Sequence, residues 1–233
     1  MIVCWNVATG TGNAALLSAR RGGRVTGVDF EPSLLQVAER RADRSGCEVR
    51  WLLGDVAALP VPDDSADVVL SVFGVMCATD HDAAVRELAR VAARQARIAL
   101  ASWVPDSVMP AMGRVLSAYL PPPPSSTGPP SRWGDPDTLR GLLEPHGLHL
   151  VAASTRRLIL HFSDPAAGCD FLVRTAGHVV AERERLSRAG RWDDLCQDLS
   201  QLVEEHAEHA VDGLHLPLDF LLASATNTPR LRS

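Results

Sequence analysis

The chain has 233 residues, a hydrophobic content of 46% and a formal net charge of -5 at pH 7. Its length suits one α/β domain, and its composition is typical of a globular protein rather than a disordered one. No run of like charges indicates nucleic acid or an anionic membrane as a partner, and no apolar stretch is long enough to span a bilayer. No signal peptide is visible, so we expect a cytoplasmic protein.

All 23 basic residues are arginines. The absence of lysine excludes the P-loop, Schiff-base and kinase lysines, and with them the enzymes that depend on these groups. The five cysteines are widely spaced and form no Cys-x-x-Cys pair, which favours free thiols in a reducing compartment over disulfides or zinc ligands. We expect all five to be buried, small apolar side chains: Cys4, Cys47, Cys77, Cys169 and Cys196.

The first half of the chain alternates strand-like and helix-like segments, which predicts a parallel, doubly wound sheet. Apolar runs without strict alternation are typical of strands that are covered on both faces. The expected order is strand Ile2–Val7, helix Asn13–Arg21, strand Arg24–Asp29, helix Pro32–Arg44, strand Glu48–Leu53, strand Ala66–Val72, helix His81–Arg94 and strand Arg97–Trp103.

The second half begins with a proline-rich loop over residues 120–131, which is either a stiff surface loop or a wall of a substrate pocket. The expected elements after it are helix Pro136–His146, strand Leu148–Phe162, helical segments Asp164–Leu186 and Trp192–His209, and a final strand Leu214–Ala223. We therefore expect a single α/β domain over residues 1–233. It is a Rossmann-like, mostly parallel sheet of seven strands with an antiparallel last strand, helices on both faces and a helical insertion over 164–209.

The most informative segment runs from the first strand into a turn that contains Gly10 and Gly12. Glycine suits such a turn because it adopts unusual dihedrals and lets a ligand approach the backbone closely. The helix that follows offers free N–H groups. Asp29 ends the second strand, where an acid can accept hydrogen bonds from both hydroxyls of a ribose. The pattern indicates a nucleoside-containing cofactor at the carboxyl ends of the strands.

A third element narrows the choice of cofactor. The stretch Gly10–Ala15 also matches the G-x-G-x-x-A pattern of dinucleotide-binding proteins, which by itself leaves NAD open. After the third strand, however, Asp55 can accept from the exocyclic amine of an adenine while Val56 packs on the ring. A glycine turn and two separate acids would then converge on one adenosine.

Four motifs carry a family resemblance: the glycine turn, Asp29, GDVAALPVPDDSADVV and SVFGVMCATD. In this order they resemble class I S-adenosylmethionine-dependent methyltransferases of the ubiquinone/menaquinone C-methyltransferase-like group. The resemblance covers about residues 1–103, which we expect to be a cofactor-binding half, with residues 104–233 as an acceptor-side half. The resemblance implies S-adenosylmethionine as the cofactor. The resemblance implies that Asp29 binds the ribose and that Phe30, Asp55 and Val56 contact the adenine. It implies that Gly10 and Gly12 flank the methionine part of the cofactor. Ser71 and Phe73 would line the sulfonium and acceptor side.

Asn6 and Ala8 complete the implied cofactor site but depart from the family pattern, which usually has an acid and a glycine there. An amide offers a neutral hydrogen bond where a carboxylate offers a charge-assisted one. Family members also usually carry a longer segment before the first strand. We therefore expect that the start is set too late, that the pocket is open, or that a partner subunit or a second copy covers this side.

Other candidate residues have plainer explanations. His206 and His209 are spaced as a zinc pair on a helix, but no third ligand is visible, so we expect a solvated polar face and no metal site. His81 is expected near a helix start rather than as a base, and Cys77 as a packing residue rather than a nucleophile. The acceptor side could include His161 and Trp133.

Methyl transfer needs alignment more than acid–base chemistry, so no catalytic residue is assigned. The prediction is an enzyme that methylates an oxygen, nitrogen or carbon atom of a small, partly apolar molecule, in what could be specialised metabolism. One alternative is a methyltransferase fold that works as a binding or assembly subunit, suggested by Asn6 and the short start. An NAD-dependent oxidoreductase is a third alternative, disfavoured by Asp55 and the absence of lysine.

Overall fold

The computed structural model describes residues 1–122 and 127–227. Residues 123–126 of the predicted proline-rich loop therefore lie outside the described residues. The described chain forms two compact units. Unit 1 contains residues 1–102, 127–155 and 221–227, and unit 2 contains residues 103–122 and 156–220. Unit 1 thus continues past the predicted cofactor-binding half and takes up two later segments of the chain.

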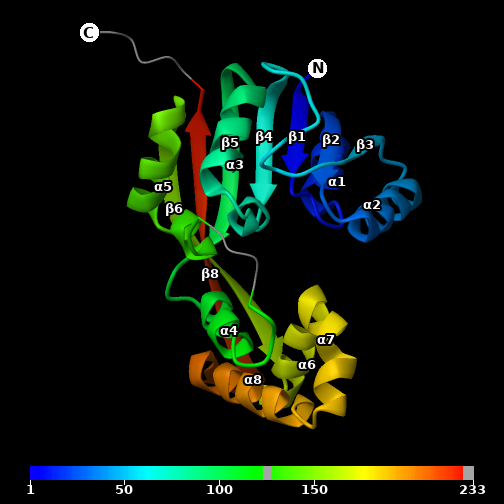
Figure 1. Cartoon of the computed structure of the whole chain (residues 1–233), viewed down its shortest axis with the longest axis vertical. Coiled ribbons are helices and arrows are strands. Elements are labelled where there is room, and N and C mark those ends of the chain that lie inside the picture. Colours follow the sequence, from blue (N-terminus) through cyan, green and yellow to red (C-terminus); the bar gives the residue numbers. More distant parts are fainter. Residues whose placement is uncertain (123–126, 228–233) are drawn as a thin grey trace. The chain divides into compact units, whose positions relative to one another are not determined.

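Unit 1 is built on a twisted sheet in the order β3-β2-β1-β4-β5-β8-β6 (Figure 1). The pairs β1–β2, β1–β4, β2–β3 and β4–β5 are parallel, and the C-terminal strands are antiparallel. The order reverses at β1, and open α/β sheets bind ligands at the carboxyl ends of the strands beside such a point. The strands are β1 Val3–Val7, β2 Arg24–Asp29, β3 Val49–Leu53, β4 Ala66–Val72, β5 Ala92–Trp103, β6 His149–Phe162 and β8 Gly213–Thr226.

The helices of unit 1 begin and end where local capping chemistry predicts. The carboxylate of Glu31 accepts from the Ser33 amide at the start of α2, Pro32 occupies its first turn, and Gly46 ends it at a φ of 61°. Asp80 caps α3 in the same way through the Ala83 amide. The helices are α1 Asn13–Arg20, α2 Pro32–Ser45, α3 His81–Val91 and α5 Pro136–Leu143, with short 3-10 turns η1 Val75–Cys77, η2 Pro130–Gly134 and η3 Glu144–His146.

Unit 2 is mainly helical and contains the adjoining halves of β6 and β8. Its core is rich in leucine, and residues such as Leu195, Leu199 and Leu216 are fully buried. Helix α4 was not expected from the sequence, because Pro110 and Gly113 interrupt its helical pattern. The remaining elements are α4 Val108–Leu116, α6 Pro165–Thr175, α7 Gly177–Arg188, α8 Trp192–His206 and β7 Glu208–Ala210.

The predicted α/β fold is confirmed, and several predicted boundaries are wrong. The third helix was expected to reach Arg94, but the chain becomes a strand at Ala92. The Asp64 and Ser65 amides donate to carbonyls of the last helical residues at 2.9 and 3.0 Å, and Ala66 pairs with Ala92. Strand β5 therefore begins directly at the end of α3, without a loop between them.

The predicted helix over 164–186 is two helices, because Ala176 adopts an extended conformation between α6 and α7. The predicted helix over 192–209 ends at His206, and the chain continues as β7. Strand β7 pairs with β8 in an antiparallel hairpin, so the described sheet has eight strands instead of the predicted seven. The two residues of the hairpin turn are Val211 and Asp212, and Gly213 begins β8 at a φ of 130°.

Candidate cofactor site

The turn between β1 and α1 is shaped by three residues in the left-handed region. Ala8, Gly10 and Gly12 have φ values of 48°, 56° and 83°. A side chain on Gly12 would lie 2.7 Å from the Trp51 ring, so this glycine is required by packing. A side chain on Gly10 would meet nothing within 4 Å. The backbone at Gly10 is therefore open on the side where a ligand could approach, and α1 begins there without a side-chain cap.

Asp29 lies against this turn, as its predicted role requires. The side chain is 4% exposed. One carboxylate oxygen accepts from the Gly10 amide at 2.7 Å, and the other accepts from the Glu31 amide at 3.0 Å. A carboxylate has about four acceptor positions. Two backbone amides fix its orientation, and acceptor capacity remains for the two hydroxyls of a ribose.

Asn6, which replaces the family's acid, braces the turn from beneath. It is 1% exposed. Its amide nitrogen donates to the Leu70 carbonyl on β4 at 3.2 Å, and its oxygen accepts from the Thr9 hydroxyl at 2.6 Å. A carboxylate could not donate to Leu70. The substitution is therefore matched by local contacts, and the amide keeps the bracing function.

Two residues that the sequence analysis missed also hold the turn. Arg41, on α2, donates from one guanidinium nitrogen to both the carbonyl and the hydroxyl of Thr11, each at 2.9 Å. Trp51, on β3, packs where side chains on Gly12 and Gly27 would otherwise lie. No sequence motif marks either residue. The partner of Arg41 is 30 positions away in the chain, and Trp51 packs on glycines, which have no side chain that could signal a contact.

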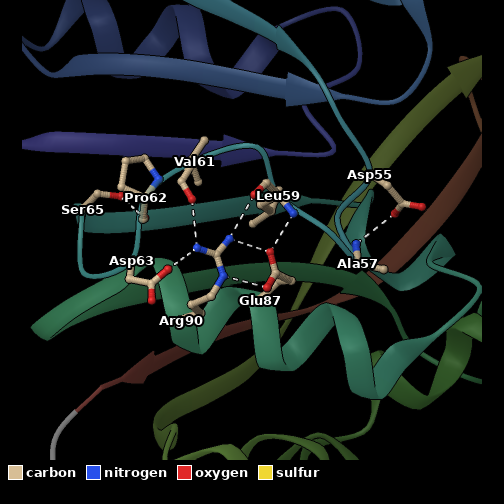
Figure 2. A network of polar contacts seen from close by, with 9 residues as sticks. All are labelled: Asp55, Ala57, Leu59, Val61, Pro62, Asp63, Ser65, Glu87 and Arg90. Atoms are coloured by element: carbon tan, nitrogen blue, oxygen red, sulfur yellow. Dashed lines mark hydrogen bonds and ion pairs between the residues drawn. The ribbon is translucent and has the colours of Figure 1, made fainter.

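Asp55 begins the loop after β3, next to Asp29. The Gly54 amide donates to the Asp29 carbonyl at 2.9 Å, so the two predicted acids belong to neighbouring strand ends. The Asp55 carboxylate is exposed and accepts from the Ala57 amide at 2.9 Å. Figure 2 shows this turn, with the carboxylate bent back over Ala57. Val56 is partly exposed.

The rest of this loop is held by a polar network from α3 (Figure 2). The Arg90 guanidinium donates to the carbonyls of Leu59 and Val61 at 3.0 and 2.9 Å and also contacts the carboxylates of Asp63 and Glu87. Glu87 in turn accepts from the Leu59 amide at 2.6 Å. The guanidinium lowers the pKa of Glu87. Sequence analysis missed this pair, which fixes the path of the loop that starts at Asp55.

The end of β4 closes the other side of the turn. The Ser71 hydroxyl is fully buried and accepts from the Val75 amide at 3.0 Å, so it shapes the loop from inside and exposes nothing to a ligand. Phe73 is half-buried with a φ of 57°. A side chain on Gly74 would lie 2.5 Å from the Ala8 Cβ. Left-handed backbone at two non-glycine residues, Ala8 and Phe73, is costly and is often found at functional sites.

Phe30 follows Asp29 and is 73% exposed. An exposed aromatic ring beside the buried Asp29 carboxylate is free to pack against a planar ligand. Unit 1 therefore brings together the glycine turn, the two acids and the aromatic ring at one end of its sheet. All ten predicted cofactor residues belong to unit 1.

The other candidate residues have structural explanations. His81 is the first residue of α3, is buried, and lies edge to face with Trp133 at 5.7 Å between ring centroids. Burial and the nearby Arg132 lower the pKa of His81. Trp133 is fully buried, so its ring is part of the core of unit 1. Cys77 is exposed, which contradicts the expectation that every thiol is buried.

Two further thiols, Cys47 and Cys196, are only partly buried. Cys47 lies between α2 and β3, and Cys196 lies in α8 against the core of unit 2. The predicted histidine pair is also separated by the structure. His206 ends α8 and contacts the Leu202 carbonyl, whereas His209 lies on β7 beside Glu204 at 3.0 Å. The two side chains are not neighbours on one helix face.

The residues of this site fit S-adenosylmethionine. The backbone at Gly10 is open, the Asp29 carboxylate retains acceptor capacity, and the aromatic ring of Phe30 is uncovered. The first turn of α1 has no side-chain cap and offers amide donors. These features match the ribose, adenine and carboxylate parts of the cofactor without displacing any core residue.

Comparisons with known proteins agree with this geometry. Residues 5–100 match the family model described as a methyltransferase domain. An uncharacterized protein of Mycobacterium tuberculosis is 31% identical over 221 residues, which cover 94% of this chain and 79% of that protein. The demethylmenaquinone methyltransferase of Thermus thermophilus is 39% identical over 117 residues, which cover 49% of this chain and 53% of that enzyme.

The fold is also that of a solved structure, the YcgJ protein of Bacillus subtilis. The TM-score is 0.69 at 19% identity, over 97% of this chain and 92% of that one. None of the helices in the described part of the chain is long and apolar enough to cross a membrane. The chain belongs to the class I S-adenosylmethionine-dependent methyltransferases, and S-adenosylmethionine is its cofactor.

Proposed function

We propose that this protein transfers the methyl group of S-adenosylmethionine to a small, partly apolar molecule. The observation that carries the proposal is the Asp29 carboxylate, which is buried, oriented by two backbone amides and held against the open backbone of Gly10. Such an arrangement costs desolvation energy unless a hydroxyl-bearing ligand uses the remaining acceptor positions. A purely structural acid would not need the glycine turn to remain open.

The cofactor supplies an activated methyl group on a sulfonium, so the residues of the protein mainly have to bind and orient. Asp29 would hold the ribose hydroxyls, and the α1 amides would meet the carboxylate of the methionine part. Phe30 and Val56 would enclose the adenine, with Asp55 as acceptor for its amine. Phe73 would face the sulfonium side. No general base is assigned, since none is needed unless the acceptor loses a proton.

Unit 2 contains an apolar cavity of the size that small molecules occupy. Its volume is about 300 Å³, which is the lower end of the range for small-molecule sites. Residues of α4 and α6 line it, and most of them are apolar: Met109, Met112, Gly113, Leu116, Leu172, Thr175 and Ala176. Methionine side chains adapt to flat or irregular ligands. A ring or a short chain is therefore a better fit than a macromolecule.

Titration calorimetry with S-adenosylmethionine tests the cofactor site. We expect one binding site per chain, and Asp29→Ala should weaken binding by about a hundredfold or more, because two ribose hydrogen bonds to a charged acceptor are lost. Glu39→Ala removes an exposed acid of α2 and serves as the matched control, with unchanged affinity expected.

A second measurement addresses turnover. Release of S-adenosylhomocysteine should rise above the background when panels of quinones, phenols and amines are added, and the responding class identifies the acceptor. Full S-adenosylmethionine affinity in a well-folded Asp29→Ala variant would contradict the assigned ribose site.

The alternative of a binding or assembly subunit rested partly on Asn6. The hydrogen bonds of Asn6 hold the turn without an acid, so Asn6 no longer supports this alternative. Tight cofactor binding without any turnover on the acceptor panels would favour this alternative. The cytoplasm remains the expected location, supported by five unpaired cysteines.

A further inference from the structure

A second cluster of chemically active side chains lies in unit 2, apart from the cofactor residues of unit 1. His161 is near the end of β6, Asp212 is in the turn between β7 and β8, and His215 is near the start of β8. Each side chain offers one ligand atom, and the three atoms lie within 4.8 Å of one another. None of them has a part in the proposed methyl transfer.

The distances between the three side chains are close to those between the ligands of a bound metal ion. Nε2 of His215 is 2.9 Å from one carboxylate oxygen of Asp212, and Nδ1 of His161 is 4.0 Å from the other. The two imidazole rings are in contact, with 4.2 Å between their centroids and 46° between their planes. Ligand atoms placed tetrahedrally around a divalent cation at about 2.0–2.2 Å are about 3.3–3.6 Å apart. Small side-chain rotations would complete the approach.

The backbone is adapted to this close approach. Gly213 has a φ of 130°, and a side chain on it would lie 2.2 Å from the Phe162 carbonyl. Only glycine lets the start of β8 lie this close to the end of β6. The same close approach places the ring of His215 on β8 against the ring of His161 on β6, and Asp212 lies in the turn just before β8. The cluster is therefore fixed by the main chain and not only by flexible side chains.

The charges around the cluster leave Asp212 available. Within residues 1–122 and 127–227, its ion-pair partners are His161 and His215, and no arginine pairs with it. The nearest arginine on β6, Arg157, is used by Asp219 at 2.7 Å and by Glu208 at 3.7 Å. His215 is also paired in register with Glu208 across the hairpin. A cation at the cluster would face carboxylates and neutral imidazoles.

We propose that His161, Asp212 and His215 bind a late first-row divalent cation, with Zn²⁺ as the reference ion. Two imidazole nitrogens and one carboxylate oxygen are ligands of the type that zinc, nickel and cobalt accept, whereas magnesium and calcium prefer oxygen alone. Water completes the coordination, since His161 and Asp212 are exposed. The ion ties the end of β6 to the β7–β8 hairpin and thereby stabilises unit 2.

The experiment uses the full chain without a histidine tag, freed of metal by a chelator. Calorimetric titration with zinc chloride is expected to show one equivalent bound, and the melting temperature should rise with zinc. His161→Ala, His215→Ala and Asp212→Asn should each weaken zinc binding by about tenfold or more. These side chains lie at the surface or near it, so the variants are expected to fold.

Two controls separate this site from other zinc ligands. His209→Ala removes an exposed histidine of β7 that is outside the cluster, and Cys77→Ser removes the exposed thiol. Both variants should bind zinc as the parent does. In the parent, zinc should also shift the side-chain NMR signals of His161 and His215 but not those of His209. Unchanged zinc affinity in all three cluster variants, no saturable binding, or an equal loss in His209→Ala would overturn the proposal.

Discussion

In unit 1, the glycine turn is held by directed hydrogen bonds, which two backbone amides donate to Asp29 and Arg41 donates to Thr11. In unit 2, helices α4, α6 and α8 are held by a continuous core of leucine and valine. A hydrogen bond specifies residue type and position, whereas a core accepts many side chains of similar volume. Unit 1 therefore carries recognisable motifs, and unit 2 carries the part in which relatives can differ.

The largest expected effect is a loss of stability in the apolar core of unit 2. Leu199→Ala removes a fully buried side chain of α8 and should lower the free energy of unfolding by about 3 kcal/mol. Chemical denaturation measures the loss, and hydrogen exchange should locate it in α6 and α8 while the amides of β1 and α1 remain protected. Equal loss of protection at the cofactor turn would show that the two units do not differ in the way described.

The next effect concerns the network of Figure 2. Arg90→Met removes the guanidinium that bonds the Leu59 and Val61 carbonyls and the Glu87 carboxylate. We expect a loss of about 2 kcal/mol in the free energy of unfolding and weaker cofactor binding, since the loop begins at Asp55. Arg86→Met, on the same helix but in an exposed ion pair, is the matched control and should change stability by less than about 0.5 kcal/mol.

A smaller effect is expected from the bracing arginine of α2. Arg41→Ala removes both bonds to Thr11 and should weaken S-adenosylmethionine binding by about tenfold, with little change in thermal stability. Arg40→Ala, its exposed neighbour on α2, should have no effect on affinity. If both variants bind equally well, Arg41 does not position the turn.

The smallest expected effect concerns a hydrogen bond in unit 2, the unit that is otherwise held by its apolar core. The Tyr119 hydroxyl donates to Asp198 at 2.5 Å, and this carboxylate raises the pKa of Tyr119 to about 12. Tyr119→Phe should cost about 1 kcal/mol near neutral pH. The phenol must be protonated to donate, so its contribution is complete below about pH 10, the unfolded value, and is lost as the pH rises towards 12.

Urea denaturation of the parent and Tyr119→Phe at about pH 8 and about pH 11 tests the sign of this dependence. The difference between the two proteins should shrink at the higher pH. A difference that grows instead would mean that the tyrosine is not stabilised in its neutral form.

The elements of unit 1 could be predicted from the sequence because each of its motifs determines the structure of a short, local segment. Gly10 and Gly12 are at positive φ, Asp29 ends β2, and Asp55 follows the adjacent strand β3. The contacts of Arg41 and Glu87 could not be predicted, since both act on backbone groups far away in the sequence. Asn6 was interpreted as a weakness, because the Leu70 carbonyl that it bonds is known only once β4 lies beside β1.

Unit 2 was predicted less well for a physical reason. A helical pattern over 164–209 fixes which residues are apolar but not where the chain breaks. The break at Ala176 and the hairpin that follows α8 were decided by packing. The cluster around Asp212 escaped notice for the same reason, because His161 reaches it only through the pairing of the strands.

The cofactor turn has a consequence for how this protein can change over generations. The groups at the start of α1 that would meet the ligand are peptide amides. A point mutation replaces a side chain but leaves the peptide group in place, so most mutations elsewhere cannot remove these donors. Substitutions on the acceptor side can therefore change the choice of substrate while these backbone donors stay in place.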